Sequence, residues 1–352
     1  MKGTKYLAAL SIPLATAMAL YWRGPLSYAA LVYAFVVIPF LELLLGEDTI
    51  NDPKTLAIEK KKTASYDWWL YVNLPIVYTL LIWGLVTVAS APLENYELIG
   101  LTLSVGVCLG TNGINVAHEL GHRKKAFEKI IAKALLLPSL YMHFFIEHNW
   151  GHHSYAATEE DPATARYNQS VFSFWISSVS RQYLNAWRIQ KQLNKEAERG
   201  FLSIKNDMFW YALIQTGYLT LLLLVFGAKT MLFAGAAAVV GFLLLETVNY
   251  IEHYGLLRKK QESGRYEAVR AKHSWNSNHV MGRIVLYELT RHSDHHYKAS
   301  KKYQILVCHE AAPQMPFGYP TSMVISFIPP LWFRLMNKRI PQDMISMAGH
   351  NK

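Results

Sequence analysis

The sequence predicts an all-α integral membrane protein with about six transmembrane helices and a histidine-rich metal site on the cytoplasmic side. Of 352 residues, 52% are hydrophobic, and the mean hydropathy of +0.10 is high for a soluble enzyme. Most of the 14 histidines fall in four short stretches, whereas the chain has only two cysteines. A bound metal must therefore be held by histidine, and no disulfide framework is expected.

Long apolar runs predict the membrane spans. Each run can cross a hydrocarbon core of about 30 Å at about 1.5 Å per residue, the shortest with help from its flanks. Glu42 is the one charge within the runs, and the last run, Met231–Leu245, is expected to continue as a helix to about residue 250. The predicted spans are about 6–21, 27–45, 69–90, 98–117, 209–226 and 231–250.

The first run resembles a secretory signal, because Lys2 and Lys5 precede it and the small residues Ala15-Thr16-Ala17 offer a cleavage site. Further spans follow at once. We therefore expect the first run to be retained as a transmembrane helix.

The distribution of lysine and arginine predicts the orientation in the membrane. Lysines 54, 60, 61 and 62 place the loop after the second span in the cytoplasm, and Arg123 marks the inner end of the fourth span. The loop Pro92–Glu97 carries acidic residues only and is expected outside. The chain then forms a single membrane-embedded domain, residues 1–352, with cytoplasmic parts at about 118–207 and 251–352. The net charge of +10 follows from this asymmetry, and no nucleic-acid motif accompanies it.

Two further apolar stretches are expected not to span. A span at Ile130–Ile146 would separate the histidines after it from His118, so we expect a re-entrant or interfacial helix, kinked at Pro138. Met323–Leu335 is interrupted by Pro329-Pro330 and is expected to lie against the membrane face.

The histidines cluster at spacings typical of metal ligands. In RHSDHH, the three histidines lie at i, i+3 and i+4, so on one helix all three imidazoles are expected to point toward one place. HELGH and HNWGHH again place histidines four apart, and NYIEHYG adds one more. The nine clustered histidines are His118, His122, His148, His152, His153, His253, His292, His295 and His296.

These residues leave several kinds of protein open. HELGH alone matches the zinc protease pattern, with Glu119 as general base, but a catalytic zinc commonly uses three protein ligands and would leave most of the histidines without a role. Nine ligands suit two metal ions. Imidazole binds Zn, Cu, Fe and Ni, and oxidising a hydrocarbon that arrives from lipid requires O₂ chemistry, for which iron is expected. A membrane iron carrier remains the non-enzymatic alternative.

Four stretches resemble, in order and spacing, the signatures of the membrane alkane monooxygenase family, which belongs to a histidine-rich membrane di-iron group with fatty-acid desaturases and hydroxylases. These stretches are HELGHRKK, EHNWGHHSYAATEEDPATAR, NYIEHYGL and LTRHSDHHYKASKKYQ. The resemblance implies two iron ions bound by the nine histidines, and hydroxylation of alkanes to 1-alkanols with O₂. Aromatic-methyl hydroxylation and fatty-acyl hydroxylation or desaturation on the same scaffold are the alternatives.

The resemblance also implies partners and a location. Electrons would come from a rubredoxin, which is reduced by an NAD(P)H-dependent reductase, and the protein would lie in a bacterial inner membrane. A rubredoxin binds its iron through four cysteines, so this chain, with Cys108 and Cys308 only, cannot contain one. Candidate contacts for an acidic carrier are Lys124, Lys125, Lys301 and Lys302.

Carboxylates near the clusters are candidates for orienting the imidazoles, because a metal-bound histidine usually donates its other N–H to such a group. Pairing with arginine is the alternative for each of them. The candidates are Glu119, Glu147, Glu160, Asp161, Glu252, Glu288 and Asp294. Among the remaining histidines, His143 and His279 are interpreted as structural, and His273, His309 and His350 have still less claim to a metal.

The fourth span continues into HELGH, so the residues above His118 on the same helix face are candidate walls of a substrate channel. They are Val107, Gly110, Thr111 and Ile114. Gly110 leaves space for an alkyl tail, but close helix packing would also select a small residue there.

Overall fold

The computed structural model describes residues 3–349. Within that range the chain is helical, and its β features are three isolated bridges. Five of its helical segments are long and apolar enough to cross a membrane, which confirms the predicted all-α membrane class. These segments are Gly24–Leu45, Ser65–Ser90, Asn95–Gly121, Asp207–Phe226 and Ala228–His253.

The first predicted span, residues 6–21, is formed by a 3₁₀ helix, Thr4–Leu10, that runs directly into α1 (Ser11–Trp22). Because α1 alone has 12 residues, it falls short of the length that a spanning α-helix needs. A span here requires both segments together, so the count of six stays a prediction.

The chain divides into two compact units, each built from three separate segments. The first unit comprises the segment up to Val37 with Thr63–Glu147 and Asn185–Leu245, and the second comprises Ile38–Lys62, His148–Leu184 and the segment from Glu246 onward. Because the chain passes repeatedly between the units, no linker in the sequence marks the division. The single-domain description stays a prediction.

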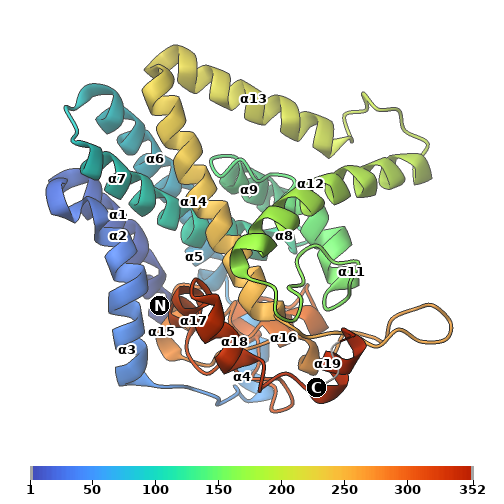
Figure 1. Cartoon of the computed structure of the whole chain (residues 1–352). Coiled ribbons are helices and arrows are strands. Elements are labelled where there is room, and N and C mark those ends of the chain that lie inside the picture. The colour runs from blue at the N-terminus through green and yellow to red at the C-terminus, as the bar shows by residue number, and fades with distance from the viewer. Residues whose placement is uncertain (1–2, 350–352) are drawn as a thin grey trace. The chain divides into compact units, whose positions relative to one another are not determined.

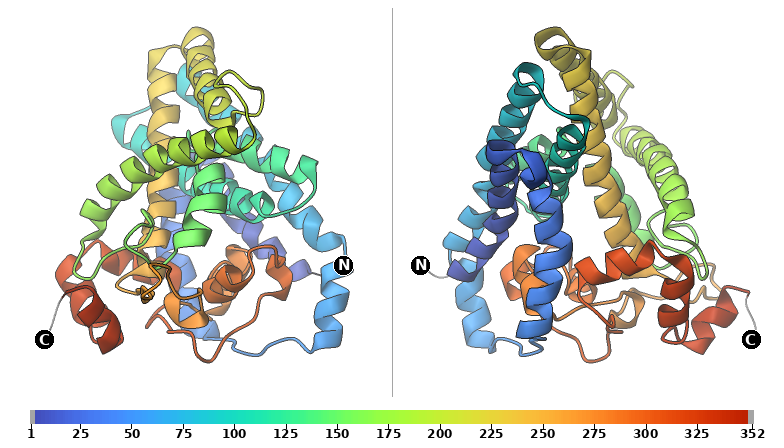
Figure 2. Two further views of the ribbon diagram at one scale, coloured as in Figure 1. Left: turned by 90° about the vertical axis from the view of Figure 1, so that its right-hand side faces the viewer. Right: turned by 60° about the vertical axis from the view of Figure 1, so that its left-hand side comes forward.

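The first unit holds most of the apolar helices (Figure 1). In chain order after α1 it contains α2 (Ala29–Val32), α5 (Ser65–Tyr71), α6 (Asn73–Ser90), α7 (Asn95–Cys108), α8 (Asn115–Gly121), α9 (Ala126–Leu136), α10 (Phe144–Ile146), the end of α12 (Val171–Glu196), α13 (Asp207–Phe226) and most of α14 (Ala228–His253). Figure 2 shows α13 and α14 joined as a hairpin. The turn uses Gly227, whose φ of 82° is costly for other residues.

Helix α7 begins at a capping box, in which Oε2 of Glu97 accepts a hydrogen bond from the backbone N–H of Glu94 at 2.9 Å. Farther along, a π-helical turn, Leu109–Ile114, connects α7 to α8. Asn112 in this turn donates to Oδ1 of Asn73 at 2.8 Å and to the carbonyl of Ala9 at 3.0 Å. The polar side chain is thus satisfied inside the apolar bundle, as a membrane interior requires.

The stretch 130–146 contains no long helix. Helix α9 ends at Leu136, and Pro138 lies in the turn that follows, where Leu140 has a positive φ of 52°. The expected kink at Pro138 is therefore wrong. The helix ends before this proline, although Leu137 keeps helical backbone angles, because proline has no N–H for the helix and its ring crowds the preceding turn. The C-terminal stretch is broken as expected, into α17 (Tyr319–Ser326) and α18 (Pro329–Met336).

The second unit contains mainly short helices, most of which come from the C-terminal half of the chain (Figure 1). It contains α3 (Ile38–Leu45), α4 (Lys54–Lys62), α11 (His153–Tyr155), the start of α12, the end of α14, α15 (Val280–Val285), α16 (His292–Tyr297), α17, α18 and α19 (Gln342–Met347).

Glu42 on α3 fixes this helix against α15 and the start of α17. Its Oε1 accepts a hydrogen bond from the backbone N–H of Gly282 at 3.1 Å. A Cβ atom at Gly282 would lie 2.6 Å from the same oxygen, and one at Gly318 would also collide with the carboxylate. The Glu42 carboxylate, which is unusual in an apolar run, is therefore bound by a backbone N–H. Gly282 and Gly318 leave space for it because they have no side chains.

Candidate metal centre

Helix α16 carries three of the candidate ligands and is held in place by Asn276. The Asn276 side chain accepts from the backbone N–H of Ser293 at 2.9 Å and donates to the Ser293 hydroxyl at 2.8 Å. Arg291, just before the helix, donates to the carbonyl of Leu306 at 2.8 Å and to that of Asp48 at 3.2 Å. A helix of six residues has little stability on its own. These contacts therefore hold α16, and with it the candidate ligands, in position.

Four buried imidazoles in the second unit converge through their Nε2 atoms. Nε2 of His292 lies 2.8 Å from that of His296 and 3.1 Å from that of His253. Nε2 of His152 lies 3.2 Å from that of His296. We call these four residues the four-histidine cluster.

The spacing in this cluster fits a metal ion. Nitrogens bound to one ion at about 2.1 Å lie about 3 Å apart when they occupy neighbouring positions. The observed separations of 2.8 to 3.2 Å match that edge length. Imidazole sets of this kind suit iron, zinc or copper.

Three more imidazoles in the second unit form a neighbouring set. Nε2 of His153 lies 3.0 Å from that of His148 and 3.1 Å from that of His295. The two sets are adjacent, because the ring centroids of His153 and His296 are 4.8 Å apart. We call His148, His153 and His295 the three-histidine set.

The structure corrects the expected pairing of histidines along the chain. The three imidazoles of RHSDHH do not point to one place, because His292 and His296 join the four-histidine cluster and His295 joins the other set. In HNWGHH, His148 pairs with His153 rather than with His152. Residues Glu147–His152 form a π-helical turn, whose wider turn brings residues five apart onto one face.

His118 and His122 lie on α8 and at its C-cap in the first unit. Their ring centroids are 5.1 Å apart, so they are neighbours as the i, i+4 spacing predicts. Glu119 between them is bound to Arg123, whose Nη2 lies 2.7 Å from its Oε1, and Arg123 also contacts Asp67. A carboxylate engaged by an arginine is poorly placed to act as the general base of a zinc protease.

The candidate carboxylates differ in what they contact. Oδ2 of Asp161 lies 3.0 Å from Nδ1 of His152, the position of an orienting group, whereas Glu252 contacts Nε2 of His292 at 3.3 Å. Glu147 accepts from Asn185 at 3.2 Å. The remaining three, Glu160, Glu288 and Asp294, pair with Lys260, Arg283 and Lys301 respectively.

Burial affects the charge state of the candidate ligands on α16. Loss of solvent, reinforced by the neighbouring imidazoles, lowers the pKa of His295 and of His296 well below the ordinary value. Both rings are therefore neutral at physiological pH. The neutral imidazole is the form that binds a metal.

The remaining described histidines have hydrogen-bonding or ring contacts outside these sets. His309 lies 2.8 Å from Oδ1 of Asp294, His279 lies 3.0 Å from the Ser277 hydroxyl, and His273 accepts from the backbone N–H of Arg270 at 3.0 Å. His143 packs edge-on against Tyr141, with ring centroids 4.3 Å apart. His350 lies outside the described residues.

Two residues that support the site were missed from the sequence. The Thr164 hydroxyl donates to Oδ2 of Asp161 at 2.6 Å, and the Tyr319 hydroxyl donates to Oε1 of Glu252 at 2.7 Å. The three-residue spacing from Asp161 to Thr164 is typical of a local turn and could have been noticed. Tyr319 is 67 residues from Glu252, and no sequence signal connects the two.

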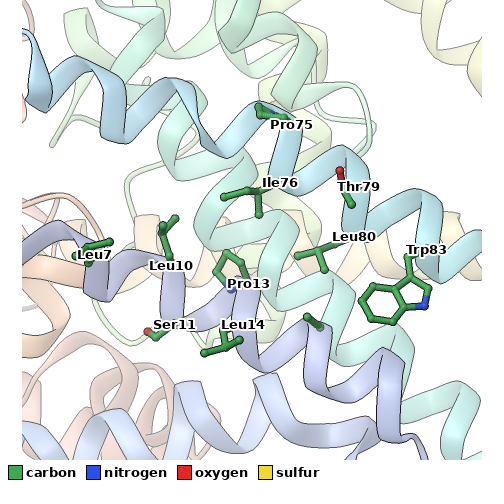
Figure 3. A pocket seen from close by; sticks show the side chains of 11 residues that line it. Leu7, Leu10, Ser11, Pro13, Leu14, Pro75, Ile76, Thr79, Leu80 and Trp83 are labelled. Carbon is green, nitrogen blue, oxygen red and sulfur yellow. The ribbon is translucent and has the colours of Figure 1, made fainter.

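The first unit has an open apolar groove of about 690 Å³ between the N-terminal helices and α6 (Figure 3). Leu10, Leu14 and Trp83 are among the residues that line it, and its two hydroxyl groups belong to Ser11 and Thr79. The four candidate channel residues of the fourth span do not line this groove.

Helices of membrane-spanning length and convergent histidines define a class, the membrane proteins with a histidine metal centre. A sequence model of the family described as fatty acid desaturase matches residues 95–323. Alkane 1-monooxygenase 1 of Alcanivorax borkumensis is 37% identical over 91% of this chain and 78% of its own length. Alkane 1-monooxygenase of Ectopseudomonas oleovorans is 38% identical over 84% of this chain and 74% of its own length.

The chain therefore belongs to the alkane 1-monooxygenase family. A more distant relative is the hydroxylase component of the xylene/toluene monooxygenase of Pseudomonas putida. It is 25% identical over 90% of this chain and 81% of its own length.

Proposed function

We propose that this enzyme hydroxylates the terminal methyl group of alkanes to give 1-alkanols, at a centre of two iron ions. One oxygen atom of O₂ enters the product and the other leaves as water, so each turnover consumes two electrons and two protons. The observation that carries the proposal is the convergence of seven imidazoles, six of them buried and that of His153 half-buried, through Nε2 into two adjacent sets.

The nine histidines divide between the ions as follows in this proposal. The four-histidine cluster holds one ion, and the three-histidine set, with His118 and His122, holds the other. The i, i+4 pair on α8 supports this division, because it offers two neighbouring imidazoles. Together with the three-histidine set, this pair would give the second ion five imidazole ligands.

Bound iron would supply the redox chemistry that activates O₂. The protein's own part is to present neutral imidazoles and to exclude water. Asp161 accepts the Nδ1 proton of His152 and so leaves its Nε2 lone pair for the metal. The α16 ligands are at most 5% exposed, so hydrogen bonds and charges here act in a medium of low polarity.

The substrate assignment rests on the relatives and the apolar helices. The relatives named for alkanes are 33–38% identical to the chain, against 25% for the relative named for xylene and toluene. A hydrocarbon dissolved in the bilayer can reach helices that lie in it, and the apolar groove of the first unit offers no charged group to such a molecule. Aromatic methyl groups remain the second candidate substrate.

Electrons are proposed to come from a rubredoxin, reduced by an NAD(P)H-dependent reductase, at the cytoplasmic side of a bacterial inner membrane. The charge asymmetry of the loops supports this orientation. Lys124 and Lys125 are exposed and suit an acidic carrier. Lys301 is less suitable, because it forms an ion pair with Asp294.

The test combines metal analysis with product detection. Purified protein is assayed for iron per chain, and for 1-alkanol from a medium-chain alkane with O₂ and reduced rubredoxin. Two irons and O₂-dependent alkanol are expected. Iron without product would favour a carrier, zinc with proteolysis would favour a protease, and faster turnover of xylene than of alkane would favour the second substrate.

A further inference from the structure

Glu252 lies at the edge of the four-histidine cluster, beside His292. Its Oε2 is 3.3 Å from Nε2 of His292. Asp161, the other carboxylate of this cluster, instead contacts a ring through Nδ1, at His152. Two carboxylates of one cluster therefore meet imidazoles from opposite sides, which indicates two different roles.

The position of Glu252 is fixed by neighbours that leave Oε2 directed at the cluster. Its Oε1 accepts a hydrogen bond from the Tyr319 hydroxyl at 2.7 Å, and its backbone carbonyl accepts from the N–H of Trp275 at 2.8 Å. The residue is 1% exposed. Glu252 also directly precedes His253, so the helix that delivers this ligand delivers the carboxylate with it.

We propose that Glu252 binds the metal of the four-histidine cluster through Oε2, so that this ion has four imidazole ligands and one carboxylate. The distance of 3.3 Å from Oε2 to Nε2 of His292 is close to the 2.8 to 3.2 Å between the cluster's nitrogens. Oε2 and Nε2 of His292 are thus separated by a distance that two neighbouring ligands of one ion can have, and a small movement of the Glu252 side chain would bring Oε2 to the ion. This inference rests on the proposed function only in assigning an ion to the cluster.

The competing explanation is that His292 donates an Nε2 proton to Glu252 and that the carboxylate merely orients the ring. In that case Nε2 of His292 would be unable to bind metal, although it lies 3.1 Å from Nε2 of His253 and 2.8 Å from Nε2 of His296. A buried carboxylate is also costly without a compensating charge. A divalent ion in the cluster supplies that charge, and carboxylate oxygen is an ordinary ligand of such ions.

The experiment compares the coordination of Co²⁺, loaded into the metal-depleted full-length protein, among four variants. They are Glu252→Ala, Glu252→Gln, Asp161→Ala and Tyr319→Phe. Loss of a ligand lowers the coordination number and strengthens the visible d–d absorption, whereas loss of an orienting group weakens binding without that change. We expect stronger absorption in Glu252→Ala only, and chelator release of one ion accelerated by about tenfold or more.

The Tyr319→Phe variant should keep the wild-type spectrum, because it removes the hydrogen bond to Oε1 and retains Oε2. An unchanged spectrum in Glu252→Ala with two ions bound would overturn the proposal, as would the same spectral change in Asp161→Ala. Wild-type protein that binds no ion in the cluster would overturn it too. Wild-type protein that binds both ions but makes no alkanol would overturn the proposed function alone.

Discussion

Nδ1 of His152 lies 3.0 Å from Oδ2 of Asp161, and both side chains are at most 1% exposed. The same oxygen accepts from the Thr164 hydroxyl at 2.6 Å, and Oδ1 accepts from the backbone N–H of Ala163 at 3.1 Å. The carboxylate is therefore fixed before it meets the imidazole. It selects the tautomer of His152 whose Nε2 lone pair is open to a metal.

Asp161→Asn should weaken metal binding in the four-histidine cluster by about 10- to 100-fold. The amide is a weaker acceptor for the Nδ1 proton and can impose the wrong tautomer. Metal per chain and the rate of release to a chelator measure the effect. Glu160→Gln is the matched control, because this neighbouring carboxylate is half exposed and lies 3.5 Å from Nζ of Lys260. Equal losses of metal binding in both variants would refute an orienting role for Asp161.

Replacing any of the nine clustered histidines by alanine should abolish alkane hydroxylation, since each imidazole holds part of one coordinated unit. His143→Ala and His279→Ala should keep substantial iron. His143 contacts Tyr141, and His279 contacts Ser277 and Glu47. Iron analysis of purified variants decides the matter, and metal loss in His143→Ala as complete as in His295→Ala would show that the set of nine is wrong.

The sequence was enough to predict which histidines are candidate ligands, but not how their side chains are grouped. The apolar runs and the charge pattern were enough to predict the apolar helices. The clustering of histidines was enough to predict seven candidate ligands whose side chains the structure brings together. The grouping within HNWGHH was wrong because it assumed α-helical turns. A π-helical turn at Glu147–His152 has no clear signature in residue type, so the pairing of His148 with His153 could not be foreseen.

Contacts between residues far apart in the sequence were the second feature that could not be predicted. Glu42 was recognised as an unusual charge in an apolar run, but its partners, Gly282 and Gly318, lie more than 200 residues away. Tyr319, whose hydroxyl donates to Glu252, is 67 residues away from it in the sequence. Such pairs depend on tertiary packing, which local pattern does not report.

Gly318→Ala should destabilise the protein, because the new Cβ would collide with the Glu42 carboxylate. Overpacking of this kind typically costs about 1–3 kcal/mol. Thermal unfolding in detergent measures it, and Glu42→Ala combined with Gly318→Ala should recover part of the loss. Gly217→Ala is the control, since no atom lies within 4 Å of its added Cβ; a Gly318→Ala variant as stable as this control would contradict the contact.

Turnover should fall as ionic strength rises when the electron carrier is limiting, because an acidic carrier would be steered by exposed basic side chains and salt screens that attraction. Lys124→Glu with Lys125→Glu should raise the KM for the carrier and flatten the salt dependence. Lys229→Glu is the matched control, because Lys229 lies between the predicted spans 209–226 and 231–250, at the start of α14, far in sequence from Lys124 and Lys125. Salt-independent turnover of the unmodified protein would argue against electrostatic docking.

Gly110 was a candidate channel wall, and the structure favours close helix packing instead. A Cβ atom there would lie 3.1 Å from the carbonyl oxygen of Gly241 and 3.4 Å from Cβ of Leu244, both on α14 in the same unit. Gly110 also lies in the π-helical turn Leu109–Ile114. The α-helical spacing that aligned it with His118 therefore does not apply across this turn.

The variant Gly110→Phe should consequently lose activity on alkanes of every length and unfold at lower temperature, because a phenyl ring would separate two helices that pack backbone to backbone. Gly235→Phe on α14 is the control, since no atom lies within 4 Å of a Cβ added there. Product yield across a chain-length series, with iron content and melting temperature, separates the two roles. Loss confined to long alkanes, with iron and stability retained, would restore the channel, because only an obstruction in the substrate's path distinguishes a long chain from a short one.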